Sequence, residues 1–320
     1  MQTITAIILT YNEELHLARC INSLKGIADT IYVIDSYSTD NTLKIAEELG
    51  ALTLCNTFVN QAIQYNWAIE NCPITTDWIL RIDADEYIDN KTGVDVRTYL
   101  SNLAANISGV IISRKIIFMG KALLHGGWYP KWNLRIYRAG HGVCENRWMD
   151  EHLVLTQGKA IEWQLDFVDD NLNDLSWWIA KHNSYASREA LEYFLTLYSL
   201  QNESGKEANL WGSKTERKRW LKRKYLHYPL FIRPVFNFLL RYILQGGFLD
   251  GKQGFLWHVL QGFWYRFLVD AKIWEMKQNL PNSFLKLTSN QPLSEAGANS
   301  ENKRIVAWMR ERYGNLKNSN

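Results

Sequence analysis

The first 90 residues alternate between short apolar runs and segments of helical periodicity, and this alternation restricts the possible folds more than any other feature. Four apolar runs rich in β-branched residues have the character of buried strands: residues 3–9, 30–35, 51–54 and 78–82. Apolar residues at helical spacing lie between them, at about residues 13–25, 38–50 and 61–71. The pattern predicts an α/β, Rossmann-like domain with a mostly parallel sheet and helices on both faces.

The rest of the chain changes character in two steps. Gly109–Phe118 has a strand pattern, residues 125–165 mix short strands with loops, and residues 173–202 are helical. The composition, 47% hydrophobic and 22% charged, is that of a globular protein. We therefore expect three regions: a nucleotide-binding and catalytic domain, a helical region and a polar tail, at residues 1–170, 171–280 and 281–320.

Charge and cysteine usage indicate where the chain works. Residues 1–120 carry 8 Lys and Arg against 14 Asp and Glu, whereas residues 121–320 carry 28 against 19, which predicts two different tasks. The four cysteines have no C-x-x-C spacing and are typical of free thiols in a reducing compartment. The N-terminal segment has no basic stretch before its apolar run, so we interpret it as a strand and expect a cytoplasmic protein.

Three polar clusters follow predicted strands: Thr10–Glu13, Asp35–Asp40 and Asp83–Glu86. Ligands of open parallel sheets bind beyond the carboxyl ends of the strands. Asp83 and Asp85 are two residues apart, so in an extended segment their side chains converge, and two close carboxylates favour a cation between them. Mg²⁺ takes one or two carboxylates together with phosphate oxygens and waters. The cluster predicts a metal that holds a diphosphate; the alternative is a solvated acidic loop.

Four stretches within these first 90 residues also resemble a known family: TAIILTYNEE, YVIDSYSTDNTLKIAEE, QYNWAIE and DWILRIDADEYI. They are similar in order and spacing to the start of a family 2 glycosyltransferase, nearest the branch with the lipopolysaccharide-core glucosyltransferases. The resemblance continues more loosely through residues 128–140 and 147–153. It implies a GT-A fold, a nucleotide-sugar donor, most simply a UDP-sugar, a Mg²⁺ or Mn²⁺ ion and an inverting mechanism.

The resemblance also assigns roles to individual positions. It places next to the nucleotide the residues Thr10, Tyr11, Glu13, Asp35, Gln64, Asn66 and Asp83, of which Asp35 matches the residue that contacts the uracil or ribose. Asp83 and Asp85 match the metal-binding D-x-D motif. The chain departs from the family at the second cluster, where the common D-D-G-S-x-D is replaced by DSYSTD.

An inverting transfer requires a base that removes the proton of the acceptor hydroxyl. The family places its base in the part of the chain that here reads MDEH, which supplies Asp150 and Glu151. Neighbouring side chains diverge, so one of the two faces the donor; we prefer Glu151, with Asp150 as the alternative. His152 is interpreted as a hydrogen-bonded histidine or, less simply, a metal ligand.

For two further sets of residues the sequence allows two interpretations each. Arg135 and Arg138 are suited to binding a diphosphate or a loop carboxylate. Trp128, Trp132 and Trp148 are suited to stacking on a sugar or to filling a core.

The segment 214–275 combines a basic run, seven Lys and Arg in Lys214–Lys224, with dense aromatic and aliphatic residues. A membrane-spanning helix needs roughly 18 apolar residues, and charged residues interrupt this segment too often. A soluble helical subdomain is the second interpretation. We favour a pair of helices in the membrane interface, with Gly246–Gly254 as the turn between them and the basic run attracted to anionic lipid. No nucleic-acid-binding module accompanies the basic run.

Together these features predict a metal-dependent inverting glycosyltransferase, peripheral on the inner face of the cell membrane. Its acceptor would be a glycan or glycolipid of cell-envelope polysaccharide or lipopolysaccharide synthesis. One alternative is a sugar-1-phosphate nucleotidyltransferase, which should have a glycine-rich basic loop where Tyr11–Glu14 lies. The other is a non-catalytic, membrane-associated glycan-binding protein, which would not need the D-x-D motif.

Overall fold

The computed structural model describes residues 2–89, 93, 95–145, 152–197 and 228–279. It divides the chain into two compact units, Met1–Asn173 with Gly247–Gly254, and Asp174–Gly246 with Phe255–Asn320. The short segment Gly247–Gly254 thus belongs to the first unit, although the sequence analysis assigned it to the helical region. The predicted tail 281–320 and the basic run 214–224 lie outside the described residues.

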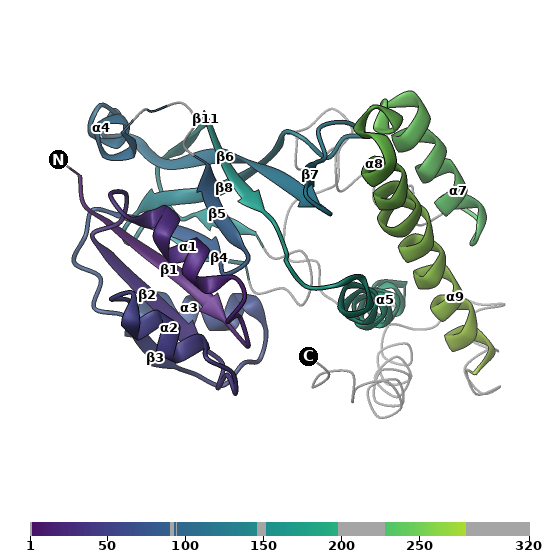
Figure 1. Cartoon of the computed structure of the whole chain (residues 1–320), viewed down its shortest axis with the longest axis horizontal. Coiled ribbons are helices and arrows are strands. Elements are labelled where there is room, and N and C mark those ends of the chain that lie inside the picture. Colours follow the sequence, from purple (N-terminus) through teal and green to yellow (C-terminus); the bar gives the residue numbers. More distant parts are fainter. Residues whose placement is uncertain (1, 90–92, 94, 146–151, 198–227, 280–320) are drawn as a thin grey trace, which may run out of the picture. The chain divides into compact units, whose positions relative to one another are not determined.

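The first unit is built on a sheet in the order β3-β2-β1-β4-β8-β6-β11-β5, with β7 paired to β6 (Figure 1). A separate two-stranded ribbon is formed by β9 and β10. The strands are β1 (Ile4–Thr10), β2 (Thr30–Asp35), β3 (Leu52–Cys55), β4 (Trp78–Asp83), β5 (Glu86–Asp89), β6 (Ile107–Phe118), β7 (Lys121–Ala122), β8 (Lys131–Arg138), β9 (Gly142–Cys144), β10 (Leu153–Leu155) and β11 (Lys159–Asp169). The helices are α1 (Leu17–Leu24), α2 (Thr42–Glu48), α3 (Gln61–Asn71) and α4 (Val96–Ser101).

The four strands predicted from the first 90 residues are parallel to one another in the sheet. Beyond β4 the sheet is mixed, because β8 runs antiparallel to both β4 and β6, while β11 is parallel to β6 and antiparallel to β5. The sheet is therefore parallel where β-α-β connections build it and mixed where the chain returns through loops and a hairpin.

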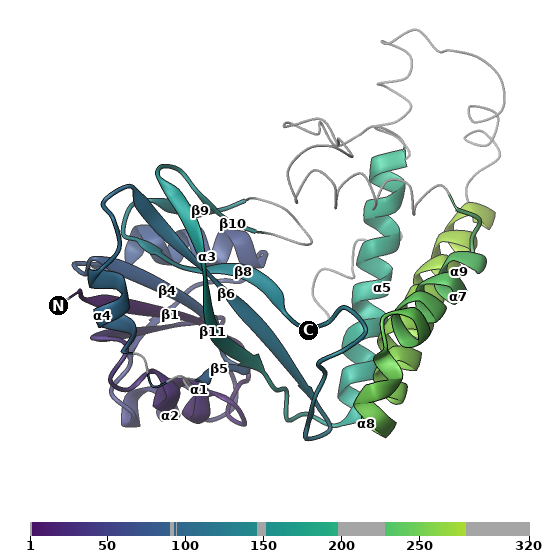
Figure 2. The same ribbon diagram turned by 90° about the horizontal axis from the view of Figure 1, so that it is seen from above.

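Alternate residues of each buried strand supply two separate cores. Ile4, Ala6 and Ile8 of β1 belong to one cluster, which includes buried residues of α1, α2 and α4. Ile7 belongs to the other, with Tyr65 and further residues of α3, β9 and β10. Figure 2 shows α3 and the β9–β10 ribbon on the side of the sheet opposite α1 and α2. This alternation is why these strands are apolar at nearly every position.

The helix after β1 begins later than predicted, at Leu17 instead of residue 13. The backbone N–H groups of Asn12, Glu13 and Glu14 donate to side chains of the loop after β2, Ser38 Oγ, Thr42 Oγ1 and Asp40 Oδ2. Asn12 also has a left-handed backbone, with φ of 54°. Tertiary hydrogen bonds and the left-handed Asn12 backbone thus hold residues 12–14 in a loop at the end of the strand, before the helix begins.

The second unit is helical. Its elements are α5 (Leu175–Leu197), α7 (Ile232–Phe238), the π-helical segment η1 (Leu239–Leu244), the end of α8 (Gly251–Trp257), the π-helical segment η3 (His258–Trp264) and α9 (Tyr265–Gln278). Ala186 and Ala190 of α5 pack with Val269 and Ile273 of α9. Among the described residues no helix is both long enough and apolar enough to cross a membrane.

Candidate functional site

The register of the sheet brings three strand ends to one level. Thr10 at the end of β1 lies opposite Asp35 at the end of β2, and Leu9 lies opposite Asp83 at the end of β4. The three polar clusters identified in the sequence therefore follow neighbouring parallel strands at the same edge. This is the place where an open α/β sheet binds its ligand.

Asp35 is fully buried and orders the loop after β2. Its Oδ1 accepts hydrogen bonds from Thr10 Oγ1 at 3.0 Å and Ser38 Oγ at 2.5 Å, and its Oδ2 accepts one from the Ser38 N–H at 2.7 Å. Tyr37 between them has a left-handed backbone, with φ of 62°, and an exposed ring. Asp35 thus supports the strand end from within, while Tyr11 and Tyr37 present aromatic rings to solvent there.

Of the two α3 residues predicted to lie near the nucleotide, Gln64 bonds to the loops after the strands and Asn66 does not. Buried Gln64 donates to Asn56 O at 3.1 Å and to Ser36 Oγ at 3.3 Å, so it bonds to the loops after β2 and β3. Asn66 instead exchanges two 2.9 Å hydrogen bonds with the backbone of Cys144 in β9. Its side-chain amide makes the two hydrogen bonds that the backbone of a neighbouring strand would make, and so fixes the β9–β10 ribbon to α3.

That ribbon carries the two candidate bases. Asp150 and Glu151, with Trp148, lie in the connection between β9 and β10, outside the described residues. The described ends of the connection are joined by a hydrogen bond from Glu145 N to His152 O at 2.9 Å. His152 therefore marks the start of the returning strand.

The D-x-D motif forms a tight turn, not the extended segment on which the sequence argument relied. The β4 strand ends at Asp83 and β5 begins at Glu86, so Ala84 and Asp85 are the turn residues. Glu86 Oε2 accepts a hydrogen bond from Asp83 N at 3.0 Å and closes the turn. Asp83 and Asp85 are both partly exposed, whereas Glu86 is buried.

Two buried arginines lie beside this turn. Arg135 of β8 pairs with Glu86 at 2.7 Å, and its guanidinium lies 3.7 Å from Asp83 Oδ2. Arg81 of β4 lies 4.0 Å from the other carboxylate oxygen of Asp83, Oδ1. Burial raises the pKa of Glu86 to about 8, against the opposing effect of Arg135. Arg135 thus meets a loop carboxylate, one of its two predicted roles, while Arg138 stacks on Trp78 and donates to Ile107 O.

The carboxylates fit a metal that shares its ligands with a nucleotide. Among the described residues there is no group of three or more His, Cys, Asp or Glu side chains that could hold a metal alone. Asp83 and Asp85 supply two carboxylates, which is the usual protein contribution to a Mg²⁺ ion that also binds phosphate oxygens. These two carboxylates therefore fit a hard divalent cation that also binds the phosphates of a nucleotide, better than they fit a metal held by protein ligands alone.

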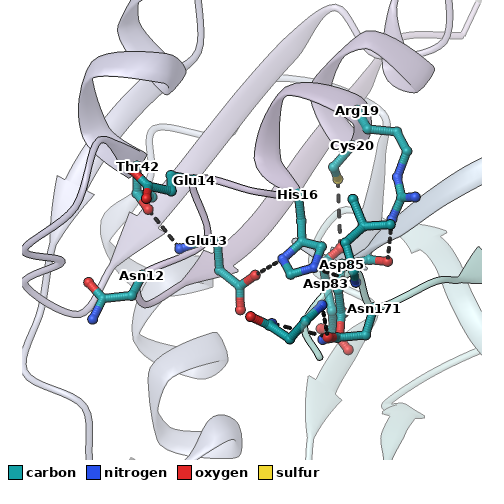
Figure 3. Close-up of polar contacts among 12 residues, drawn as sticks. Asn12, Glu13, Glu14, His16, Arg19, Cys20, Thr42, Asp83, Asp85 and Asn171 are labelled. Atoms are coloured by element: carbon teal, nitrogen blue, oxygen red, sulfur yellow. Dashed lines mark hydrogen bonds and ion pairs between the residues drawn. The ribbon is translucent and has the colours of Figure 1, made fainter. Parts of the chain in front are cut away.

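Sequence reasoning missed two residues that connect the strand ends (Figure 3). Asn171 Nδ2 donates to Asp85 Oδ2 at 3.0 Å. Buried His16 bonds through Nδ1 to Glu13 Oε2 at 2.6 Å, and its Nε2 accepts from Leu172 N at 2.9 Å. The segment after β11 thus links the candidate nucleoside carboxylate to the candidate metal carboxylate. The polar run DDNLND directly after a strand was the available signal.

A third contact holds the same segment. Arg19 of α1 pairs with Asp170 at 2.5 Å and also donates to Asp85 O at 3.4 Å, with its guanidinium over the Tyr87 ring. Asp170 N donates to Asp85 O at 3.2 Å.

Residues 5–142 match the model of glycosyl transferase family 2. An uncharacterized glycosyltransferase of Rickettsia felis is 44% identical over 91 residues, which are 28% of this chain and 31% of that protein, so the chain matches less than a third of that relative's length. A lipopolysaccharide core biosynthesis glycosyltransferase of Rhizobium meliloti, LpsC, is 27% identical over 288 residues, 85% of this chain and 92% of that protein.

Among solved structures, glucosyl-3-phosphoglycerate synthase of Mycobacterium tuberculosis in complex with Mn²⁺, UDP and glucosyl-3-phosphoglycerate is 20% identical. The match has a TM-score of 0.30 and covers 35% of this chain and 44% of that one, too slight a likeness to bear on function. The family match and the helix-covered parallel strands that continue into a mixed sheet identify a GT-A-like fold. Over residues 5–142 this chain is therefore similar to glycosyl transferase family 2.

Proposed function

We propose that this chain is a metal-dependent, inverting glycosyltransferase that uses a nucleotide-sugar, in the first instance a UDP-sugar. The observation that carries the proposal is the Asp83–Glu86 turn, which places two partly exposed carboxylates at the end of β4, level with the polar ends of β1 and β2. The family match of the same residues supports glycosyl transfer as the reaction.

In this proposal the chain's own residues divide the donor between them. Thr10, Tyr11, Glu13 and Asp35 lie at the ends of β1 and β2 and would take the nucleoside, with Asp35 acting mainly by ordering the loop that it bonds. Asp83 and Asp85 would hold Mg²⁺ or Mn²⁺, which supplies charge stabilisation to the leaving diphosphate.

Gln64 supports the nucleoside side through the loops after β2 and β3. Asn66 would act indirectly: it fixes β9, and the connection between β9 and β10 contains the candidate bases.

The acceptor hydroxyl must lose its proton as its oxygen attacks the anomeric carbon. Glu151, or Asp150 beside it, would take that proton, on the face of the sugar opposite the diphosphate. Attack from that face inverts the anomeric configuration.

The acceptor is proposed to be a glycan or glycolipid of cell-envelope polysaccharide or lipopolysaccharide synthesis, reached at the inner face of the cell membrane. The name and the extent of the match to LpsC support this class. The two alternatives are less well supported: the loop after β1 has no glycine-rich basic sequence for a nucleotidyltransferase, and a glycan-binding protein has no need of the Asp83–Glu86 turn.

The test is nucleotide release from a panel of UDP-, GDP-, dTDP- and CMP-sugars by the full chain with Mn²⁺. We expect release from one nucleotide class, lost at least about 100-fold in Asp85→Asn and in Glu151→Gln or Asp150→Asn. Glu70→Gln, an exposed carboxylate of α3, is the matched control and should keep full activity. Release that persists in all of these variants, or none with any donor, would contradict the proposal.

A further inference from the structure

The helix formed by α7 and η1 exposes a continuous apolar face. Seven aliphatic or aromatic residues recur along it at helical spacing and are each 40–78% exposed: Ile232, Val235, Phe236, Leu239, Leu240, Ile243 and Leu244. We call this set the apolar stripe. A soluble surface scatters such residues singly, whereas a contiguous apolar face marks a site of interaction.

The helix is held firmly by its other face, so the stripe is not the result of a loosely placed segment. Arg233 and Asp270 of α9 form an ion pair in which both side chains are almost fully buried, and Phe231 N donates to Asp270 Oδ2 at 2.8 Å. Asn237 donates to Gly262 O at 2.7 Å. The polar side chains of Arg233 and Asn237 are therefore directed inward, while the residues of the apolar stripe face outward.

The charges around the stripe favour lipid over a second protein surface. From Tyr228 to Leu249 the sequence contains no Asp or Glu, and of its two arginines Arg233 is buried against Asp270 whereas Arg241 is partly exposed. The basic run Lys214–Lys224, with seven Lys and Arg, ends only four residues before Tyr228. An apolar face without acidic residues, with a basic run close to it in the sequence, matches a bilayer surface with anionic headgroups, where each nearby cation adds to the attraction.

We propose that the apolar stripe lies in the interface of an anionic lipid bilayer, parallel to the membrane plane. An in-plane arrangement agrees with the finding that no described helix could span a membrane. This surface goes beyond the proposed function, because lipid binding needs neither donor nor acceptor and is measured without them.

The test is sedimentation of the full chain with vesicles of phosphatidylcholine alone and of phosphatidylcholine with phosphatidylglycerol. We expect binding to the anionic vesicles that weakens as salt is raised. Phe236→Ser/Leu244→Ser should lower the partition coefficient at least about tenfold, because both side chains leave water on binding. Leu52→Ser/Leu124→Ser replaces two exposed apolar residues of the first unit and should bind like the wild type.

Because the replaced residues are exposed, the variants should keep the wild-type circular dichroism, which is checked first. Wild-type protein that does not sediment with anionic vesicles would overturn the proposal, as would equal binding by the stripe variant. A wild-type dimer in solution that becomes a monomer in Phe236→Ser/Leu244→Ser would also overturn it and would assign the stripe to a second copy of the chain.

Discussion

At the residue scale, His16 shows how one buried side chain joins distant segments. Because Leu172 N–H donates to Nε2, that nitrogen carries no proton, and Nδ1–H points to Glu13. The imidazole therefore has one tautomer, fixed by a residue 156 positions away. The orientation of Glu13 at the end of β1 thus depends on the chain that follows β11.

Asn171 is expected to orient Asp85 for the metal. Asn171→Ala removes the 3.0 Å bond to Asp85 Oδ2, so UDP affinity in Mn²⁺ should fall about 3- to 10-fold, equivalent to roughly 1 kcal/mol for one hydrogen bond. UDP affinity in EDTA should not change, since the amide acts only through the metal carboxylate.

Isothermal titration of UDP into the wild type, Asn171→Ala and a control variant, with Mn²⁺ and with EDTA, measures this. Asn71→Ala is the control, because that exposed amide bonds within its own helix, to Trp67 O. An equal loss with and without metal would assign Asn171 a structural role only.

The sequence could predict some of these residues and not others. Asp35, Asp83 and Asp85 directly follow apolar strands, so local pattern alone places them at the strand ends. His16 and Asn171 act through partners that are far away in sequence, and no periodicity reveals such pairs. Asn66 matched a nucleotide-side position, yet its amide is engaged by the Cys144 backbone, which only the tertiary structure shows.

At the element scale, the buried ion pair between α7 and α9 is expected to be essential for the helical unit. Asp270→Ala leaves the Arg233 guanidinium buried without its partner, and should lower the free energy of unfolding by about 3–5 kcal/mol. Arg233→Met/Asp270→Leu, which removes both charges, should recover most of that loss. Urea unfolding followed by circular dichroism tests this, and a loss below about 1 kcal/mol in Asp270→Ala would contradict it.

His182 on α5 should make the helical unit less stable in acid. Burial lowers the pKa of His182 to about 4, although its Nδ1–H donates to Trp178 O at 2.8 Å. The unfolded chain binds the proton near pH 6.5 and the folded chain only near pH 4. The stabilisation is therefore complete above about pH 6.5 and is lost as the pH falls towards 4, by up to about 3 kcal/mol.

The measurement is urea unfolding at pH 7 and pH 5 for the wild type and His182→Phe, which keeps an aromatic ring near Trp178. The wild type should lose more stability between the two pH values than the variant does. The same pH dependence in both proteins would assign the effect to other groups.

Elements with strong local signals were predicted well. The strand 30–35 and the helix 61–71 coincide with β2 and α3. The predicted start of the helix after β1 was wrong by four residues, because tertiary hydrogen bonds to Ser38, Asp40 and Thr42 hold Asn12–Glu14 in a loop. The π-helical segments were also not predicted; in η3 the Gly262 carbonyl accepts from Asn237 on another helix, a contact that no local pattern reveals.

At the scale of the whole molecule, the two units match the charge asymmetry of the sequence. The acidic first part carries the strand ends with Asp35, Asp83 and Asp85, and the second carries the apolar stripe and the basic run. The two proposals rest on different units and are tested separately. Failure of lipid binding would not affect the proposed donor site. Failure of nucleotide binding would not affect the proposed lipid-binding stripe.

The central claim is that the Asp83–Glu86 turn holds a metal that holds a nucleoside diphosphate. The most direct measurement is isothermal titration of UDP into the full chain with Mn²⁺, with EDTA, and with Asp83→Ala/Asp85→Ala in place of the wild type. We predict UDP binding with Mn²⁺ that weakens at least about 100-fold in EDTA and in the variant, as expected for loss of the metal or of both its protein ligands. UDP binding in EDTA, or by the variant, that is as tight as wild-type binding with Mn²⁺ would contradict the account.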